Sequence, residues 1–345
     1  MYARKPTVKV IYNNKDISAD ISASMISLSY KDKVSGEADE LEITVSDDAA
    51  RWQDEWYPEK GATLIVTIYL DGSQLDCGSF QLDEIKLSGP ADEVTIKAIS
   101  SGFRQKTRTK RSYAHENKTL SEIVRSIAAR IGYIVVGDLE NVQINRSTQH
   151  RESDLHYLNR LALMYGYNFS VKGKQLIFVK QKELEGRNAS LSLDKSDITE
   201  YDFTDKTSEI FSGTTIKYHN PNTNKVVTSS RNATFQQQSI EYINELDTLE
   251  LRTKVENEEQ ANMKAEAAIY RTVSKQQTGN ISCEGNVLLI SGNNVELTGF
   301  GKFSGVWHVL TATHTVDNGD GYACSAELKR IGAITDPVKK KVSKN

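Results

Sequence analysis

Hydrophobic and polar residues alternate along two long stretches of the chain, and a shorter stretch with helical spacing separates them. The first alternating stretch runs from about Val8 to Ser101, and the second runs from about Leu191 to Arg330. Alternation with a period of two is typical of strands that bury one face and expose the other. The pattern therefore predicts a mainly β chain with an α+β insert.

Turn signals divide the first stretch into six or more short strands, with almost no helix between them. Many short strands joined by tight turns are typical of a barrel or sandwich. Leu82 continues the alternation of its strand, whereas Ile85 and Leu87 are displaced by one position, which predicts a β-bulge near Asp83. The segment Arg51–Trp56 lacks the alternation, and we expect a short helical or looped excursion there that caps one end.

Helical spacing begins after residue 118 and predicts a compact α/β module. Thr119 and Glu122 have the spacing of a capping box ahead of an apolar helical face, and Gly132 is placed to end that helix. Ser153 is predicted to be the N-cap of a second helix that ends at Gly166. A short β-hairpin is predicted directly after this second helix.

The second alternating stretch predicts strands at 214–218, 226–229, 281–284, 287–290 and 295–297. A hairpin is expected near its end, around a glycine-rich turn at Asn318. One helix is predicted at about 257–275, with the small residues Ala261, Ala265 and Ala268 on one side. Small side chains would let this helix lie close against a sheet, and a surface helix of good intrinsic propensity is the alternative.

These patterns divide the chain into four parts. We predict a first β domain, a barrel or sandwich, at 1–104, a small α/β module with two helices at 105–185, a second β domain with one helix at 186–335, and a flexible basic tail at 336–345. The chain has only 5 prolines, which argues against extended linkers between these parts.

Composition is that of an ordinary soluble globular protein, with 38% hydrophobic and 26% charged residues over 345 positions. The formal charge of -3 gives no overall attraction to nucleic acid or to anionic membranes. The run from Arg104 to Arg111 holds five positive charges without interleaved aromatic residues. We therefore interpret it as a solvated connector, or as a rim facing an acidic partner, rather than as a nucleic-acid surface. The first residues lack the apolar core of a signal peptide, and the longest apolar run is strand-sized, so cytoplasmic synthesis is expected.

Histidines and cysteines do not form a metal or redox motif in the sequence. His308 and His314 are expected on the same face of one strand, roughly 20 Å apart at about 3.3 Å per residue, which is too far to share an ion. His150 and His156 flank a predicted helix start without the further ligands of a zinc site. The cysteines are too few and too scattered for a disulfide framework and are expected to be reduced: Cys77, Cys283 and Cys324.

Motifs for nucleophilic, zinc-dependent and phosphate-binding chemistry are absent from the sequence. The acidic neighbours Asp47 with Asp48, and Asp138 with Glu140, are interpreted as turn and rim residues rather than as the carboxylate pair of a glycan hydrolase. We therefore predict no catalytic residue, no cofactor site and no metal site. The protein is not predicted to be an enzyme.

Three stretches of the sequence together resemble the phage late control D family, at 78–85, at 152–169, and at 296–314 with 322–328. These are the tail hub proteins of contractile phages and of phage tail-like bacteriocins, related to the N-terminal part of type VI secretion spike proteins. The resemblance implies two tube-protein-like β-barrels per chain and a homotrimer. Three chains would then present six barrels, which match a hexameric tail tube on one face and a trimeric central spike on the other.

The resemblance also implies partners and a location. The expected partners are the tail tube or tube initiator protein, a central spike on a separate chain, the baseplate wedge proteins and the tape measure protein. Specific nucleic-acid recognition and membrane insertion by the chain itself are not expected. The protein would assemble in the bacterial host cytoplasm and end in the baseplate of a phage tail or tail-like particle. The predicted helix at 257–275 would belong to the second barrel, and Arg51–Trp56 would take the equivalent place in the first.

Two other classes of function stay open from the residues alone. One is a tail-associated cell-wall hydrolase, and the other is a glycan- or receptor-binding β protein. Trp307 and the lysines at 339–341 are candidates for contact with tube or spike, with core packing and a solvated tail as the alternatives.

Overall fold

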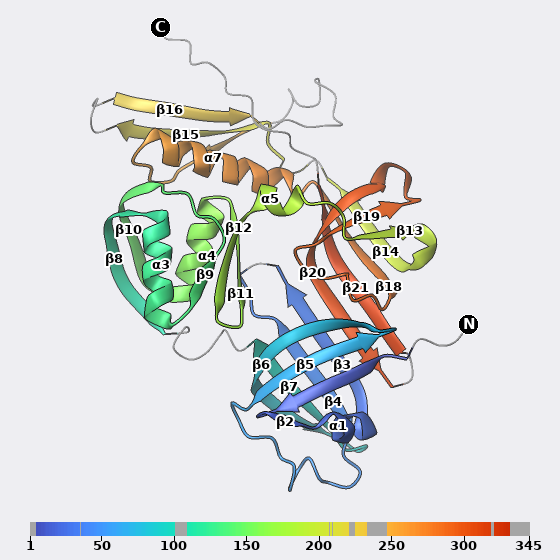
Figure 1. Ribbon diagram of the computed structural model, residues 1–345. Coiled ribbons are helices and arrows are strands. Elements are labelled where there is room, and N and C mark those ends of the chain that lie inside the picture. The colour runs from blue at the N-terminus through green and yellow to red at the C-terminus, as the bar shows by residue number, and fades with distance from the viewer. Residues whose placement is uncertain are drawn as a thin grey trace.

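The computed structural model describes residues 5–34, 36–100, 109–206, 208, 210–220, 225–232, 247–318 and 321–331. Over these residues the chain forms one 13-stranded sheet, one two-stranded sheet and two three-stranded sheets (Figure 1). The mainly β fold predicted from the alternating pattern is confirmed. Within the described ranges, we find no helix with the length and apolar character needed to cross a membrane.

The large sheet contains two groups of strands from opposite ends of the chain. The N-terminal β region comprises β1 (Thr7–Tyr12), β2 (Lys15–Asp16), β3 (Met25–Lys33), β4 (Glu40–Ser46), β5 (Thr63–Leu70), β6 (Ser73–Ser88) and β7 (Glu93–Ser100). The C-terminal β region comprises β13 (Leu191–Asp194), β14 (Ile198–Asp205), β18 (Gln277–Glu284), β19 (Asn294–Thr298), β20 (Gly305–Asp317) and β21 (Gly321–Arg330). The sequence analysis identified these two groups but did not foresee that one sheet contains both.

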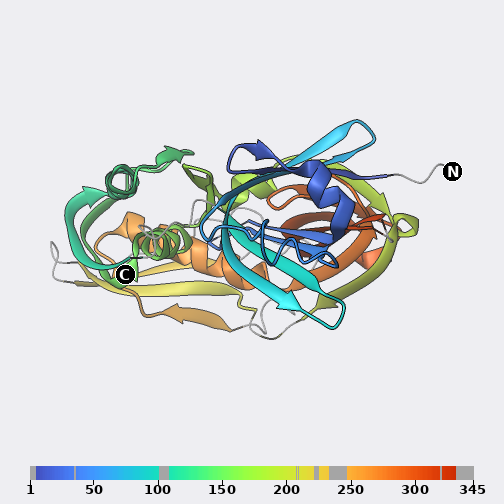
Figure 2. The ribbon, with the colours of Figure 1, turned by 90° about the horizontal axis from the view of Figure 1, so that it is seen from below.

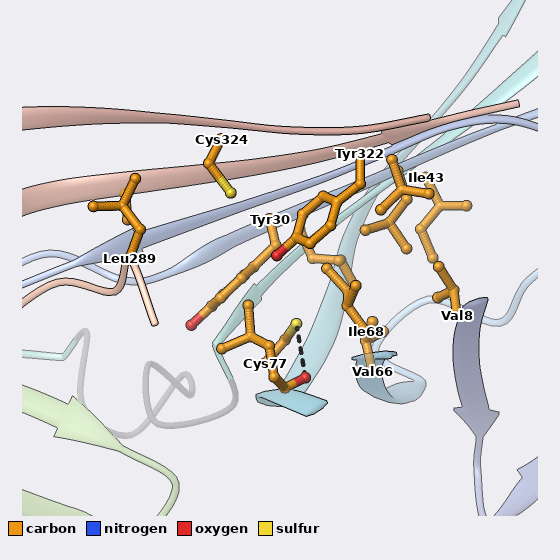
Figure 3. Packing of buried hydrophobic residues seen from close by; sticks show 14 of the residues in the cluster. Val8, Tyr30, Ile43, Val66, Ile68, Cys77, Leu289, Tyr322 and Cys324 are labelled. Atoms are coloured by element: carbon orange, nitrogen blue, oxygen red, sulfur yellow. Dashed lines mark hydrogen bonds between the residues drawn. The ribbon is translucent and has the colours of Figure 1, made fainter. Parts of the chain in front are cut away.

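Antiparallel pairing between β20 and β3 joins the two β regions, with His314 opposite Tyr30. The buried side chains of both regions form one continuous hydrophobic cluster. Figure 3 shows this shared core, in which Tyr322 and Cys324 of β21 lie beside Tyr30 of β3 and near Cys77 of β6. The two regions are therefore one packing unit over the described residues.

The two β regions have the same strand order. In chain order, the six main strands of the N-terminal region are β1, β3, β4, β5, β6 and β7, and their order in the sheet is β3-β4-β7-β6-β5-β1. The six strands of the C-terminal region are β13, β14, β18, β19, β20 and β21, and the corresponding order is β14-β18-β21-β20-β19-β13. With the strands of each region numbered along the chain, both regions have the order 2-3-6-5-4-1 across the sheet. One difference is that β1 pairs antiparallel with β5, whereas β13 pairs parallel with β19.

Register shifts recur at corresponding strand pairs of the two regions. The pairs β3–β4 and β14–β18 each carry a shift, and so do β6–β7 and β20–β21. The shift in β6 falls between Leu82 and Glu84, which confirms the bulge predicted near Asp83. A bulge inserts one residue into a strand and reverses the faces of all later side chains.

The α/β module lies to one side of both β regions (Figure 2). Its elements are β8 (Lys110–Thr119), α3 (Leu120–Ile131), β9 (Ile134–Val136), β10 (Gln143–Ser153), α4 (Asp154–Met164), β11 (Tyr167–Lys172), β12 (Gln175–Lys180) and α5 (Gln181–Glu185). The predicted capping box is present, because the Thr119 hydroxyl accepts from the Glu122 N–H and the Glu122 carboxylate accepts from the Thr119 N–H. Ser153 caps α4 as predicted, and the module has its own hydrophobic core.

A third part consists of β15 (Gly213–Asn220), β16 (Lys225–Asn232), β17 (Thr248–Leu251) and the helix α7 (Glu258–Val273). The small side of α7 packs as predicted, since Ala261 and Ala265 are buried against Ile216 and Tyr218 of β15. The resemblance placed this helix in the second barrel. The structure instead places α7 between the small sheet and the module, with its far end near β21 (Figure 1).

The other local features comprise one wrong prediction, one helix that was not predicted and one confirmed loop. The segment 287–290 is a turn rather than a strand, because Leu288 N–H bonds to the side chain of Asn286 instead of to a neighbouring strand. The helix α1 (Ser18–Ser24) was not predicted, since its 7 residues are too few to show a helical period. The segment Arg51–Trp56 is looped, as expected, and the Asp47 carboxylate accepts the N–H groups of Trp52 and Gln53. Two 3-10 turns complete the elements of the described residues, η1 (Lys195–Asp197) and η2 (Gly301–Phe303).

Candidate functional site

A buried ionic cluster holds the N-terminal β region, the module and the C-terminal β region together. Lys172, at the end of β11, places its ammonium 2.7 Å from Asp32 of β3 and 2.6 Å from Asp39. The second oxygen of Asp32 accepts the N–H of Ser291, and the second oxygen of Asp39 accepts the N–H of Lys33. Three segments that are distant in sequence therefore meet at one pair of carboxylates. We call this group, Asp32, Asp39 and Lys172, the junction cluster.

The three charges of the junction cluster compensate one another. Asp32 and Asp39 are 5% and 4% exposed. Burial and the neighbouring Asp32 raise the pKa of Asp39, although the Lys172 ammonium opposes this shift. Burial by itself would lower the pKa of Lys172, but the two carboxylates raise it above its ordinary value. The ammonium therefore offsets the cost of burying two like charges side by side.

The loop after β3 docks on the module beside the junction cluster. The Gly36 N–H bonds to the Phe169 carbonyl at 2.7 Å, and the Val34 N–H bonds to the Leu310 carbonyl at 3.0 Å. A Cβ atom at Gly36 would lie 2.3 Å from the side chain of Asn159 in α4, and its backbone has φ +70. A larger residue would strain the backbone at this φ and would require the Asn159 side chain to move, whereas glycine requires neither.

A second tie connects the end of the module to the C-terminal β region. The Asn294 side chain donates to the carbonyls of Leu184, Glu185 and Arg187 and accepts from His308 Nδ1 at 2.8 Å. Lys329 of β21 lies 2.5 Å from the Glu185 carboxylate, and both side chains are about nine-tenths buried. The short helix α5 is thereby fixed to β19 and β21.

A third tie attaches the start of α7 to the module. The Glu256 carboxylate accepts the N–H groups of Asn145 and Arg146 at 2.6 and 3.2 Å. The Gln260 side chain donates to the Gln143 carbonyl at 2.6 Å. Despite burial, these donors lower the pKa of Glu256, so the carboxylate stays ionised. With the three ties, every part of the described chain is held to the module.

The large sheet has edges that no described strand covers. The strand β14 pairs with β18 on one side, and its other edge faces away from the described strands. Residues 84–88 of β6 likewise pair only with β7 among the described strands, and Leu87 among them is 52% exposed. Unpaired edges attract other strands unless they are covered in an assembly.

An aromatic cluster lies under the free edge of β14. The ring of Phe203 lies 5.1 to 5.6 Å from the rings of Phe300, Phe303 and Trp307. Tyr201 at the outer side is 48% exposed, whereas Trp307 is fully buried and donates its indole N–H to the Phe303 carbonyl. Core packing, the alternative given for Trp307, is therefore correct.

The candidate histidines do not assemble into a site. The predicted common face of His308 and His314 is wrong, because the bulge between Val309 and Thr311 reverses the side-chain order of β20 between them. His308 points to Asn294, and His314 lies in the core with Tyr30 and Tyr322. Burial lowers their pKa values to about 3 and about 4, so both rings are neutral at neutral pH. Among the described residues, no group of three metal-ligating side chains gathers at one point.

The other candidate residues have structural partners. The three cysteines are free and buried, and burial raises the pKa of Cys283 to about 12 and that of Cys324 to about 11. Asp47 caps the looped segment, and Glu140 forms an ion pair with Lys180 at 2.8 Å. His156 lies 3.8 Å from Glu152. Residues 104–108 of the basic run and all of the tail at 336–345 lie outside the described residues.

The junction cluster was missed in the sequence, although one signal pointed to it. Leu28, Tyr30 and Asp32 occupy successive inward positions of β3, and all three are buried. A charged residue at the inward position of a strand requires a buried partner. The sequence could not show that this partner is Lys172, because 140 residues separate the two.

Comparison with known sequences gives a consistent result. A family model described as "Phage tail baseplate hub (GPD)" matches residues 86–320. The chain is 34% identical over 178 residues to the "Probable baseplate hub protein" of Escherichia phage P2, and 33% identical over 178 residues to that of Escherichia phage 186. Each alignment covers 51% of this chain and 45% of the relative, so the match spans less than half the length of either relative.

Solved structures share the fold at low sequence identity. A tail protein from Neisseria meningitidis MC58 aligns with a TM-score of 0.70 at 13% identity, over 96% of this chain and 98% of that chain. The 43 kDa tail protein of prophage MuSo2 from Shewanella oneidensis aligns with a TM-score of 0.69 at 15% identity, over 96% and 100%. A type VI secretion component from E. coli aligns with a TM-score of 0.58 at 12% identity, over 92% and 76%.

Proposed function

The chain belongs to the phage tail baseplate hub (GPD) family, and we propose that it is a homotrimeric symmetry adaptor at the end of a tail tube. In this role three copies join a hexameric tube on one face to a trimeric central spike on the other. The tube initiator, the baseplate wedge proteins and the tape measure protein are the further partners that we propose. The role is structural rather than catalytic.

The repeated strand order is the observation that carries this proposal. Each copy presents the same six-strand arrangement twice, in the N-terminal and C-terminal β regions. Three copies around a threefold axis therefore supply six similar units, which is the number that a hexameric ring requires. The first two ties to the module support this role, because a load-transmitting adaptor needs its two units held at a fixed spacing.

The pairing of β20 with β3 inside one chain suggests how neighbouring copies meet. β20 corresponds to β6, and β3 corresponds to β14, in the repeated strand order. The free edges of β6 and β14 are thus the two surfaces that would repeat this pairing between copies. Closure around a ring would leave neither edge exposed.

The matching register shifts give the residues of this interface. Aligning the shift of β6 with that of β20 puts Leu87 at the position of His314. Aligning the shift of β14 with that of β3 puts Phe203 at the position of Tyr30. Because His314 and Tyr30 are opposite each other, Leu87 of one copy should lie opposite Phe203 of the next. The exposed leucine would then join the aromatic cluster under β14.

Disulfide trapping tests this interface directly. Opposed residues in antiparallel strands have Cα atoms about 4.5 to 5.5 Å apart, which is within the range that a disulfide can bridge. Oxidation of the double variant Leu87→Cys with Phe203→Cys should yield covalently linked trimers on a denaturing gel. Neither single variant should do so. Double-variant protein that is trimeric by light scattering but fails to cross-link would contradict the register and leave the trimer standing.

The trimer itself is tested by mass in solution, with the spike chain co-expressed. We expect the wild type to contribute three copies of the 38.6 kDa chain, after the mass of any bound spike is subtracted. Leu87→Lys should reduce this to the monomer, because a charge would be buried against Phe203. Ile134→Lys, at an exposed apolar residue of the module rather than of a β region, is the matched control and should leave the trimer intact. A wild-type protein that is monomeric under all these conditions would contradict the proposal.

A further inference from the structure

A cleft of about 450 Å³ opens between the module and the segment that leads from β17 into α7. Its lining includes the apolar side chains of Ile144, Leu161 and Tyr165, with Arg146, Arg160, Lys254 and Lys264 around them. This volume lies within the range of ligand-binding clefts. Glu256 and Gln260 of the third tie lie in its lining, and the hub role proposed above does not use the cleft itself.

Lys264 is a buried cation that forms no ion pair among the described residues, although the Glu256 carboxylate attracts its charge at longer range. Its side chain in α7 is 7% exposed, and its ammonium donates to the Lys254 carbonyl at 2.8 Å and lies 5.4 Å from the Tyr165 ring centre. Among the described residues, no carboxylate lies within ion-pair distance of it. Burial lowers the pKa of Lys264 to about 8, so most of the population is still charged at pH 7. A buried ammonium with one hydrogen bond retains two free donors.

The carboxylates near the cleft are already engaged by other groups. Arg160 pairs with Glu152 at 2.6 Å, outside the cleft lining. Glu256 accepts two backbone N–H groups and the Gln260 amide, and it lies 3.5 Å from Lys254. Arg146 pairs with Glu116 at 3.8 Å, but both of those side chains are 60% exposed, which makes the pair weak. The cleft therefore has an excess of positive charge over an apolar floor.

We propose that this cleft binds an acidic segment of a partner protein, with a carboxylate on Lys264 and a neighbouring apolar side chain against Met164, a half-buried residue of the lining. A carboxylate supplies the charge-assisted hydrogen bonds that Lys264 lacks. Met164 favours a peptide over inorganic phosphate, because phosphate would leave this half-buried apolar side chain without a contact. A peptide is also favoured over nucleic acid, because the Tyr165 ring is 3% exposed and offers no face for base stacking.

The experiment is a binding assay of the full chain against an array of hexapeptides in which acidic and apolar residues are permuted. Each peptide has a counterpart with glutamine or asparagine in place of the acids. We expect a subset of acidic peptides to bind, and their neutral counterparts to bind at least about tenfold more weakly, as loss of a charge-assisted hydrogen bond predicts. Equal binding of acidic and neutral peptides would overturn the proposal, as would binding of an oligonucleotide that competes for the cleft.

Lys264→Met separates a binding role from a structural one. Methionine keeps the length of the buried chain and removes the charge, so thermal stability should be unchanged or higher. Peptide affinity should fall about tenfold or more. Lys97→Met, at a half-exposed lysine of β7 near Glu42, removes the same charge elsewhere and should not change affinity. A variant Lys264→Met that melts earlier and binds peptide as the wild type does would assign Lys264 to the fold alone. Trimer mass is measured separately, so failure here leaves the hub proposal untouched.

Discussion

Removal of the single ammonium in the junction cluster should destabilise the fold far more than removal of an ordinary lysine. In Lys172→Met, the carboxylates of Asp32 and Asp39 remain buried without their shared counter-ion. Breaking a buried pair in this way costs roughly 3 to 5 kcal/mol. The Lys172 side chain is 38% exposed, so water can partly solvate the site. We therefore expect a loss of about 3 kcal/mol, the lower end of that range.

Urea unfolding followed by tryptophan fluorescence measures this loss in the relevant part of the molecule, because Trp52, Trp56 and Trp307 all belong to or pack on the shared core. Lys97→Met is the matched control and should cost no more than about 1 kcal/mol, since that lysine is half exposed and 3.8 Å from Glu42. Hydrogen exchange at the amide of Gly36 gives a local readout, because its partner carbonyl lies on the module.

Neutralising the whole cluster should restore much of the stability. In the triple variant Asp32→Asn, Asp39→Asn and Lys172→Met, each asparagine oxygen can still accept the N–H of Ser291 or of Lys33. Neutral replacement of a buried ionic group is often nearly free of cost. Should Lys172→Met be no worse than the control, or should the triple variant be as unstable as the single one, the assigned role of the cluster would be refuted.

Three further predictions concern single residues. The pKa values of His308 and His314 are lowered to about 3 and about 4 from the ordinary 6.5, so the unfolded chain binds more protons than the folded chain below pH 6.5. The free energy of unfolding should therefore fall by about 2 kcal/mol per histidine between pH 7.5 and pH 5, measured from urea midpoints. A free energy of unfolding that does not fall in acid would contradict the assigned burial. Thr119→Ala should cost about 1 kcal/mol through loss of its helix cap, whereas Thr119→Ser should cost little in the same unfolding assay. Gly279→Ala should lower the free energy of unfolding by about 1 to 3 kcal/mol, because the new Cβ would lie 2.3 Å from the Phe203 ring. An unchanged melting temperature would show that this ring moves freely.

Local signals in the sequence were sufficient for much of the fold. The capping box at Thr119, the cap at Ser153 and the bulge near Asp83 each depend on residues within a few positions of one another, and all three are confirmed. The strand prediction for 287–290 was wrong because Val287, Leu289 and Ile290 pack in or against the core from a turn. An apolar pattern alone does not distinguish such a turn from a strand.

Long-range pairing was the part that the sequence could not give. The pattern of β3 is the same whether its neighbour is β1 or β20, so the joining of the two β regions could not be read from it. The junction cluster shows the same limit, because the inward position of Asp32 requires a buried partner but the sequence does not identify that partner as Lys172, which the fold brings to 2.7 Å. The bulge at Val309 was also unpredicted, and it alone reversed the expected face of His314.

Electron cryomicroscopy of an assembled tail tip tests the central claim most directly. We predict three copies of the chain around a threefold axis at the end of the tube, with six similar β units in one ring and β6 of each copy paired with β14 of the next. A ring built from six copies of the chain would contradict this account, and so would a tip from which the chain is absent.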